Sequence, residues 1–108
     1  AIKKNIYIDD SFFTILGDGG RVDRHNHIGD LDKDSSLNLG SQKYSLVYYL
    51  CVGDQNCKEP GILKLYGPSE DILPSEGMIT IFPADRDHSV VYNGKKDRVM
   101  IGINFYSL

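Results

Sequence analysis

The sequence predicts an all-β domain of about eight strands, folded as a two-sheet jelly roll. The apolar segments are short and rich in β-branched and aromatic residues, and none repeats apolar residues at the i, i+3, i+4, i+7 positions of an amphipathic helix. Clusters of Gly, Pro, Asn and Asp separate these segments at short intervals. At 108 residues the chain has the length of one domain, so we expect a single domain over residues 1–108.

Each expected strand is an apolar run that ends at a turn signal. In chain order the expected strands are residues 2–8, 11–16, 21–25, 44–52, 61–66, 78–82, 88–92 and 98–106. Glycine and proline mark the turns between them, as in residues 17–20, 53–61, 67–77 and 83–87. The longest irregular stretch, residues 28–42, is a surface loop by composition, and its acidic run "DLDKD" indicates a solvated segment.

Composition limits the classes of partner. The net charge is -3 and no run of basic residues occurs, so we expect no nucleic-acid partner. No stretch approaches ~20 apolar residues and the N-terminal residues do not resemble a signal peptide, so we expect a soluble cytoplasmic protein without a membrane partner. Cys51 and Cys57 match neither a redox nor a zinc spacing, which predicts two free thiols.

The three histidines of the chain are the candidate metal ligands. His25 and His27 lie in "RHNHIGD", and on a strand two residues at this spacing point to the same face. His88 begins a late strand, and in a jelly roll an early and a late strand lie near each other at one mouth of the sandwich. Three imidazoles could therefore converge on one metal ion. The alternative is that each histidine is a solvated or hydrogen-bonded surface residue.

A resemblance to a known family extends over about residues 12–106. The segments "RHNH", "YSLVYYL", "GILKLYGP", "GMITIFPADRDHSVVYNGKKDR" and "VMIGINFY" resemble, in this order, the core of the iron(II)/2-oxoglutarate-dependent oxygenases, especially the prolyl-4-hydroxylase-like branch. In that family a double-stranded β-helix holds iron with an H-x-D pair and a distal histidine. An arginine about ten residues further on binds the far carboxylate of 2-oxoglutarate, and a tyrosine assists it.

The resemblance implies a role for five residues of this chain. His25 and His88 take the two histidine places, Arg98 the carboxylate clamp and Tyr49 the helper, with Fe(2+) as the metal and 2-oxoglutarate as co-substrate. His27 stands where the family usually has aspartate and would be the third ligand, which removes a negative charge and favours other ions that prefer imidazole. The implied reaction uses O2 to hydroxylate a C–H bond of a peptide or small molecule and yields succinate and CO2. A further departure is Gly102, where the family has a polar residue.

The clamp requires Arg98 and His88 to face the same side of the sheet. We expect their two strands to form a hairpin. A two-residue Asn93-Gly94 turn would put the pair on opposite faces, whereas a three-residue loop, residues 92–94, sets His88 opposite Arg98, with Gly94 at positive φ. We expect that loop; the alternative for Arg98 is a surface strand arginine. We also expect an inward-pointing Tyr49 whose hydroxyl bonds to a bound carboxylate or to the backbone.

Two other functional classes compete with the oxygenase. "GGRVDRHNHIGDLD" and "GMITIFPADRDH" approach the two cupin motifs, with Asp32 where cupins have a glutamate ligand. About fifty residues separate His27 from Gly77, more than a compact cupin needs, and cupins give no role to Arg98. The third reading is a jelly-roll binding module without catalysis.

Overall fold

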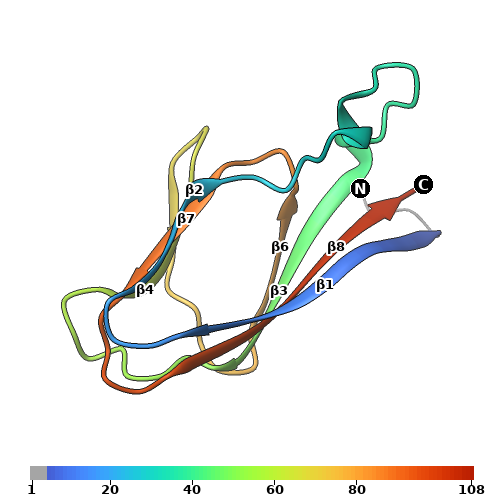
Figure 1. The fold of residues 1–108 in the computed structure, drawn as a ribbon. Coiled ribbons are helices and arrows are strands. Elements are labelled where there is room, and N and C mark those ends of the chain that lie inside the picture. The colour runs from blue at the N-terminus through green and yellow to red at the C-terminus, as the bar shows by residue number, and fades with distance from the viewer. Residues whose placement is uncertain (1–4) are drawn as a thin grey trace.

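Two four-stranded antiparallel sheets face each other in the structure, a computed structural model that describes residues 5–108 (Figure 1). The first sheet has the order β1-β8-β3-β6, formed by Ile6–Leu16, Arg98–Ser107, Lys43–Cys51 and Ile79–Pro83. The second has the order β2-β7-β4-β5, formed by Gly20–His25, His88–Tyr92, Pro60–Leu65 and Glu70–Ile72. This arrangement is the jelly roll, or double-stranded β-helix, and it confirms the predicted fold class.

The first and fifth strands differ from the sequence-based expectation. The two strands expected at residues 2–8 and 11–16 form the single strand β1, because the chain accommodates Asp9 as a bulge and pairing with β8 continues on both sides of it. Residues 2–4 of that expectation lie outside the described residues. Strand β5 was not predicted, because its three residues lie among the turn signals of residues 67–77.

The core lies between the two sheets, and buried positions alternate with outward-facing ones along β4, β6, β7 and most of β8. The buried apolar side chains are Leu16, Tyr49, Leu63, Leu65, Phe82, Val90, Tyr92 and Met100. On β8 the inward positions are Arg98, Met100, Gly102 and Asn104, all of which are buried. The polar members of this inward row therefore reach the space between the sheets.

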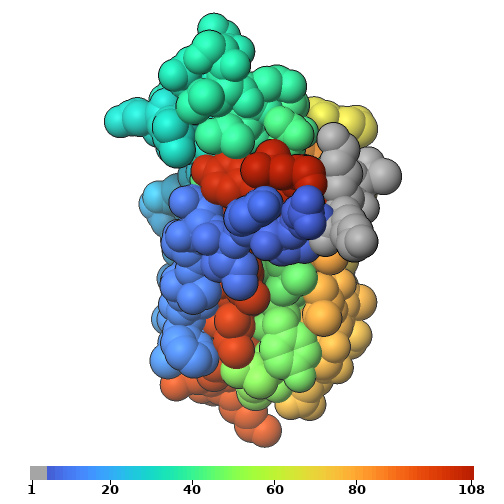
Figure 2. Space-filling model, turned by 90° about the vertical axis from the view of Figure 1, so that its right-hand side faces the viewer, coloured from blue at the N-terminus to red at the C-terminus, as the bar shows by residue number. Residues whose placement is uncertain are grey.

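Figure 2 shows the outer face of the β1-β8-β3-β6 sheet, on which several large apolar side chains are exposed. Neighbouring strands place Phe13, Ile101, Tyr48 and Ile79 in one row across it. The exposed fractions of Phe13 and Ile79 are 72% and 54%. The side chains that carry chemistry thus lie on the inner face and at the mouth rather than on this surface.

The loop of residues 28–42 is fixed to the barrel by a buried ion pair. The loop contains the 3₁₀ turns η1 (Leu31–Lys33) and η2 (Gly40–Gln42). Lys43 Nζ donates to Asp32 Oδ2 at 2.8 Å, the Tyr106 hydroxyl donates to Asp32 Oδ1 at 2.6 Å, and the Asp32 side chain is only 1% exposed. The prediction of a solvated acidic run is therefore wrong for Asp32, because Lys43 follows the loop and folds back onto it.

No helix among residues 5–108 has the length and apolar character needed to span a membrane.

Candidate metal centre

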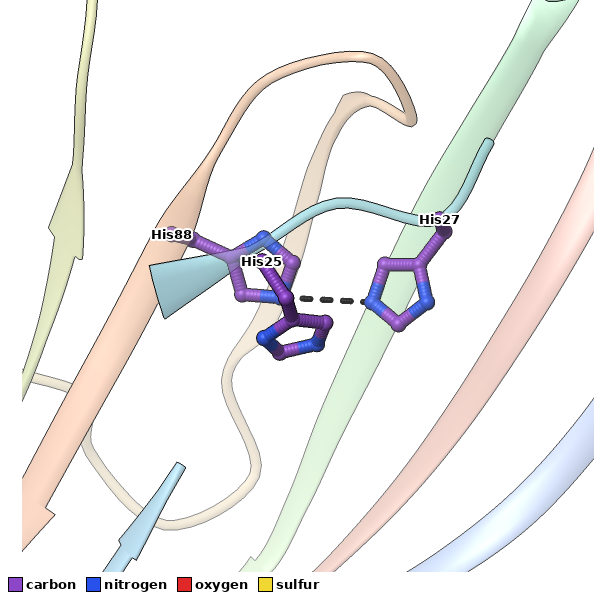
Figure 3. Close-up of side chains that lie close together, drawn as sticks. All are labelled: His25, His27 and His88. Carbon is purple, nitrogen blue, oxygen red and sulfur yellow. Dashed lines mark hydrogen bonds between the residues drawn. The ribbon is translucent and has the colours of Figure 1, made fainter. Parts of the chain in front are cut away.

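The structure brings the three histidines together at one mouth of the barrel (Figure 3). His25 ends β2, His88 begins β7, and the two residues are paired directly across these strands. His27 follows β2 by two residues, and its amide donates to the Ala84 carbonyl at 2.9 Å. Each ring offers a nitrogen within 4.8 Å of the nitrogens offered by the other two, which fits a single ion.

A bulge in β2 aims His25 into the barrel. Val22 is paired with Val90, but the next pair is His25 with His88, so β2 carries one extra residue over this interval. One extra residue reverses the face of every side chain that follows it. Without the bulge Arg24 would face the interior; with it, His25 does, and His27 keeps the same side. The sequence contains no signal for this bulge.

Burial keeps two of the histidines, His27 and His88, in the neutral form that binds metals. Burial, with the nearby His88 and His25 rings, lowers the pKa of His27 to about 4. Burial also lowers the pKa of His88, which is 6% exposed. Both rings are therefore neutral near pH 7, with a lone pair for a metal ion.

Backbone carbonyls select the ligating nitrogen of two of the rings. His25 Nδ1 donates to the Asp23 carbonyl at 2.7 Å, and His88 Nδ1 donates to the Arg86 carbonyl at 3.3 Å. A proton on Nδ1 leaves the Nε2 lone pair of each ring free to bind a metal. This is the usual outer support of a histidine ligand.

The spacing of the ring nitrogens fits a metal ion. His27 Nε2 and His88 Nε2 are 3.2 Å apart. Two nitrogens at that separation subtend about 100° at an ion roughly 2.1 Å from each, a usual angle between adjacent ligands. The donor set of three imidazoles suits iron, zinc, copper or nickel and does not suit calcium or magnesium.

A narrow cavity of about 80 Å³ runs inward from the histidines between the sheets. Its walls include Thr14, Val47, Tyr49, Leu63 and Met100 together with the three histidines. Tyr49 points inward and is 2% exposed, as its shared face with Val47 predicted. Burial raises the pKa of the Tyr49 phenol, so its hydroxyl stays protonated and can donate a hydrogen bond.

Gly102 leaves room for an aromatic wall beside the histidines. A Cβ at position 102 would lie 2.4 Å from the Phe12 ring, which stacks on His27 with centroids 6.0 Å apart. Phe12 thus occupies the space that a polar side chain on the last strand would fill.

Arg98 is fully buried and stacked between two tyrosines. Its guanidinium carbon lies 5.6 Å from the Tyr49 ring centre and 5.4 Å from that of Tyr92. Nη1 donates to the Gly61 carbonyl at 2.7 Å, whereas Nε is buried without a partner. Within residues 5–108 no carboxylate forms an ion pair with Arg98, so the alternative of a surface strand arginine is wrong.

The structure contradicts the route by which Arg98 was expected to reach the interior. Strand β7 pairs with β2 and β4, while β8 pairs with β1 and β3, so His88 and Arg98 lie in different sheets and not across a hairpin. Gly94 does not have positive φ; it is required because a Cβ there would lie 2.3 Å from the Asp54 carbonyl oxygen. Residues 93–97 cross from one sheet to the other, and turn rules for hairpins do not apply.

Thr80 on β6 is a polar wall residue that sequence reasoning missed. Its Oγ1 is buried and completes no hydrogen bond. The Thr80 hydroxyl nevertheless lies close to the Tyr49 hydroxyl and lowers the pKa of Tyr49, although the larger effect of burial raises it. Only its alternation with Ile79 and Ile81 in "ITIF" could have indicated that it faces inward.

Asp32 is not part of the histidine cluster. Its two oxygens are used by Lys43, Tyr106 and the Gly29 amide. Burial pushes the pKa of Asp32 upward, but these hydrogen bonds outweigh it and hold the pKa below its ordinary value. The prediction of Asp32 as a fourth, cupin-like ligand has no support in this geometry.

No protein-family model matches the sequence, and no curated protein sequence is similar enough to it to count as a relative. Several solved structures share the fold. An oxidoreductase of the 2OG-Fe(II) oxygenase family from Burkholderia pseudomallei matches 95% of this chain with a TM-score of 0.70 and 12% identity. A prolyl-4-hydroxylase from Pseudomonas putida matches 97% with a TM-score of 0.66 and 20% identity. A cupin domain from Bordetella pertussis matches 94% with a TM-score of 0.53 and 16% identity.

These likenesses show the fold alone, because all three identities are low. The chain spans 44% of the Burkholderia protein and 54% of the Pseudomonas protein, about half the length of each, and 92% of the cupin domain. The barrel is thus the part of the oxygenases that this chain shares. The jelly roll is the fold that this chain shares with both the oxygenases and the cupin.

Proposed function

We propose that this chain is the barrel of an iron(II)- and 2-oxoglutarate-dependent oxygenase that hydroxylates a C–H bond of a peptide or small molecule. His25, His27 and His88 hold the iron. Arg98, with Tyr49 and Thr80, binds the far carboxylate of 2-oxoglutarate. The fold and the histidine cluster are observed, and the iron and 2-oxoglutarate are what the proposal adds to them.

The observation that carries the proposal is the unpaired polar cluster around Arg98. A buried guanidinium is costly unless an anion neutralises it, and the described chain provides none. Arg98 Nε and Thr80 Oγ1 are buried without partners, and Tyr49 lies between them and the histidine cavity. An anion from outside the chain would satisfy these groups, and a guanidinium is suited to a carboxylate.

The position of this cluster favours a diacid over a simple anion. Arg98 and Gly102 are four residues apart on one strand, which places their Cα atoms roughly 13 Å apart, with the histidines near Gly102. An arginine side chain spans part of that distance, and a short diacid spans the remainder. The co-substrate would thus bind the metal at one end and Arg98 at the other.

The residues of this chain supply positioning and the exclusion of water. Iron(II), when bound with 2-oxoglutarate, supplies the oxidation: 2-oxoglutarate, O2 and R–H become succinate, CO2 and R–OH. Phe12, Val47 and Met100 form apolar walls around the cavity, which limits water near the reacting groups. Arg98 and Tyr49 orient the diacid, and the three histidines fix the ion.

The direct test is uncoupled turnover. Purified protein with iron(II), ascorbate, O2 and 2-oxoglutarate, without substrate, should release succinate, and His88→Ala should abolish this release. As a control for substitution at a surface position, Arg21→Met removes an arginine whose side chain is 68% exposed, and it should leave the rate unchanged. Absence of succinate from a protein that has bound iron would reject the assignment.

The second candidate is a cupin-type metal protein that does not use 2-oxoglutarate. The observation that favours it is His27, because the cluster holds a second histidine at the place where the oxygenase family usually has aspartate and the cupin motif has histidine. In that case the protein binds a divalent metal, Arg98→Met leaves its chemistry unchanged, and added 2-oxoglutarate does not alter the metal spectrum.

A further inference from the structure

Asn104 contacts the one histidine whose outer support differs from the others. His25 and His88 each direct Nδ1 at a backbone carbonyl, which accepts a proton. His27 Nδ1 instead lies 3.3 Å from Asn104 Nδ2, an amide nitrogen that can only donate. His27 Nδ1 must therefore be the acceptor, and in the neutral ring the proton is on Nε2.

Asp10 and Ser45 fix the orientation of the Asn104 amide. Asn104 Nδ2 donates to Asp10 Oδ1 at 2.8 Å, and Ser45 Oγ donates to Asn104 Oδ1 at 2.7 Å. A carboxylate accepts but does not donate, so turning the amide would place two acceptors against each other. Asn104 is 3% exposed and Ser45 is 2% exposed, so water cannot readily replace these bonds.

The contact between His27 and His88 agrees with this proton arrangement. His88 Nδ1 donates to a carbonyl, so His88 Nε2 accepts, and His27 Nε2 at 3.2 Å is its donor. A continuous series of hydrogen bonds then joins Asp10, Asn104, His27 and His88 to the Arg86 carbonyl.

We propose that Asn104, oriented by Asp10, is a positioning residue that selects the ring nitrogen of His27 and opposes metal entry until its amide turns. The proposal rests on the proposed metal site. With a metal on Nε2, the His27 proton moves to Nδ1 and needs an acceptor. The Asn104 amide turns to present Oδ1, its Nδ2 faces Ser45 Oγ, and Asp10 is released to solvent.

A charge-conserving exchange tests the proposal through metal affinity alone. In the double variant Asp10→Asn with Asn104→Asp, the carboxylate accepts from His27 Nδ1, Ser45 and the new asparagine, which favours the ligating form of the ring. Outer partners of histidine ligands change metal affinity by about 10- to 100-fold. Titrated with Co(II) alone, the exchanged protein should bind about 10-fold or more tightly than wild type.

The single variant Asp10→Asn tests the sign of the effect. Loss of a negative charge near a cation should weaken binding, but release of the Asn104 amide should strengthen it, and we expect tighter Co(II) binding. Asp71→Asn is the control for the loss of a surface carboxylate, because Asp71 is exposed on β5 and shares no strand with the histidines. It should weaken Co(II) binding slightly or leave it unchanged.

A measurement on the metal-free wild type decides the matter if a variant fails to fold. Nitrogen-15 spectra that identify the protonated ring nitrogen should show Nε2–H for His27 and Nδ1–H for His25 and His88. A proton on His27 Nδ1, or a folded exchange variant that binds Co(II) no more tightly than wild type, would overturn the proposal. Failure of the folded wild type to bind Co(II) would instead reject the metal site, whatever the ring form.

Discussion

Replacement of Arg98 by methionine should separate co-substrate binding from folding. Methionine keeps most of the length and apolar character of the side chain and removes the charge. A buried charged hydrogen-bonded pair that loses one partner costs about 3–5 kcal/mol of binding, so we expect 2-oxoglutarate affinity to fall roughly 10²- to 10⁴-fold. Metal affinity should stay within about twofold, since Arg98 contacts none of the histidines.

The same substitution should have little effect on the free energy of unfolding without ligands. The variant loses the bond to the Gly61 carbonyl, worth about 1–2 kcal/mol, and it also loses a desolvated cation with an unpaired Nε. Burial lowers the pKa of Arg98, as expected for a desolvated cation without a carboxylate partner among the described residues. The two effects oppose each other, and we expect a net change within about 1.5 kcal/mol.

Urea unfolding and calorimetric titration with 2-oxoglutarate, in the presence of Mn(II), measure the two quantities. Arg21→Met controls for the loss of an arginine, because its pair with Asp23 is exposed and worth at most about 1 kcal/mol. A folded Arg98→Met protein that keeps its affinity for 2-oxoglutarate within threefold would refute the reasoning, as would a loss of stability above about 3 kcal/mol with unchanged affinity.

Three further predictions concern the supports of the site. The pKa of His27 is about 4 in the folded protein against an ordinary 6.5, so the unfolded chain takes up the proton first as the pH falls. The free energy of unfolding of the metal-free protein should therefore be highest above pH 6.5 and about 2 kcal/mol lower at pH 5. His27→Gln should reduce this pH dependence in urea unfolding. Gly61→Ala should cost about 2–4 kcal/mol and displace the Arg98 guanidinium, because φ is +86° and the new Cβ would lie 1.3 Å from Nη1. Gly19→Ala, at φ +78° with open space, should show only the backbone part of that cost in thermal unfolding. Asp32→Asn should lower stability by about 1–3 kcal/mol and leave the dissociation constant for Mn(II) within twofold; a large loss of metal would restore Asp32 as a ligand.

The sequence predicts the fold class and the inward-facing positions of individual strands because these depend on local patterns. Alternation in short apolar runs indicates strands, and the spacing of His25 and His27 indicates a shared face. The inward position of Tyr49 follows from the same alternation. These features depend on residues near one another in the chain, which a pattern can reveal.

The features that sequence reasoning missed depend on irregular backbone or on distant contacts. The β2 bulge that turns His25 inward adds one residue without glycine or proline. The crossing between β7 and β8 places His88 and Arg98 in different sheets, which a hairpin rule cannot foresee. The contacts of Asn104 and Asp32 join residues 77 and 74 positions apart in the chain. Such pairs are decided by tertiary packing.

The most direct test of the central claim is an anaerobic titration of the purified protein with iron(II), followed by 2-oxoglutarate. We predict one iron per chain, a visible absorption band that appears only when 2-oxoglutarate is added, and no such band in Arg98→Met at the same concentration. Iron that binds without any spectral response to 2-oxoglutarate, or a folded protein that binds no iron, would contradict the account.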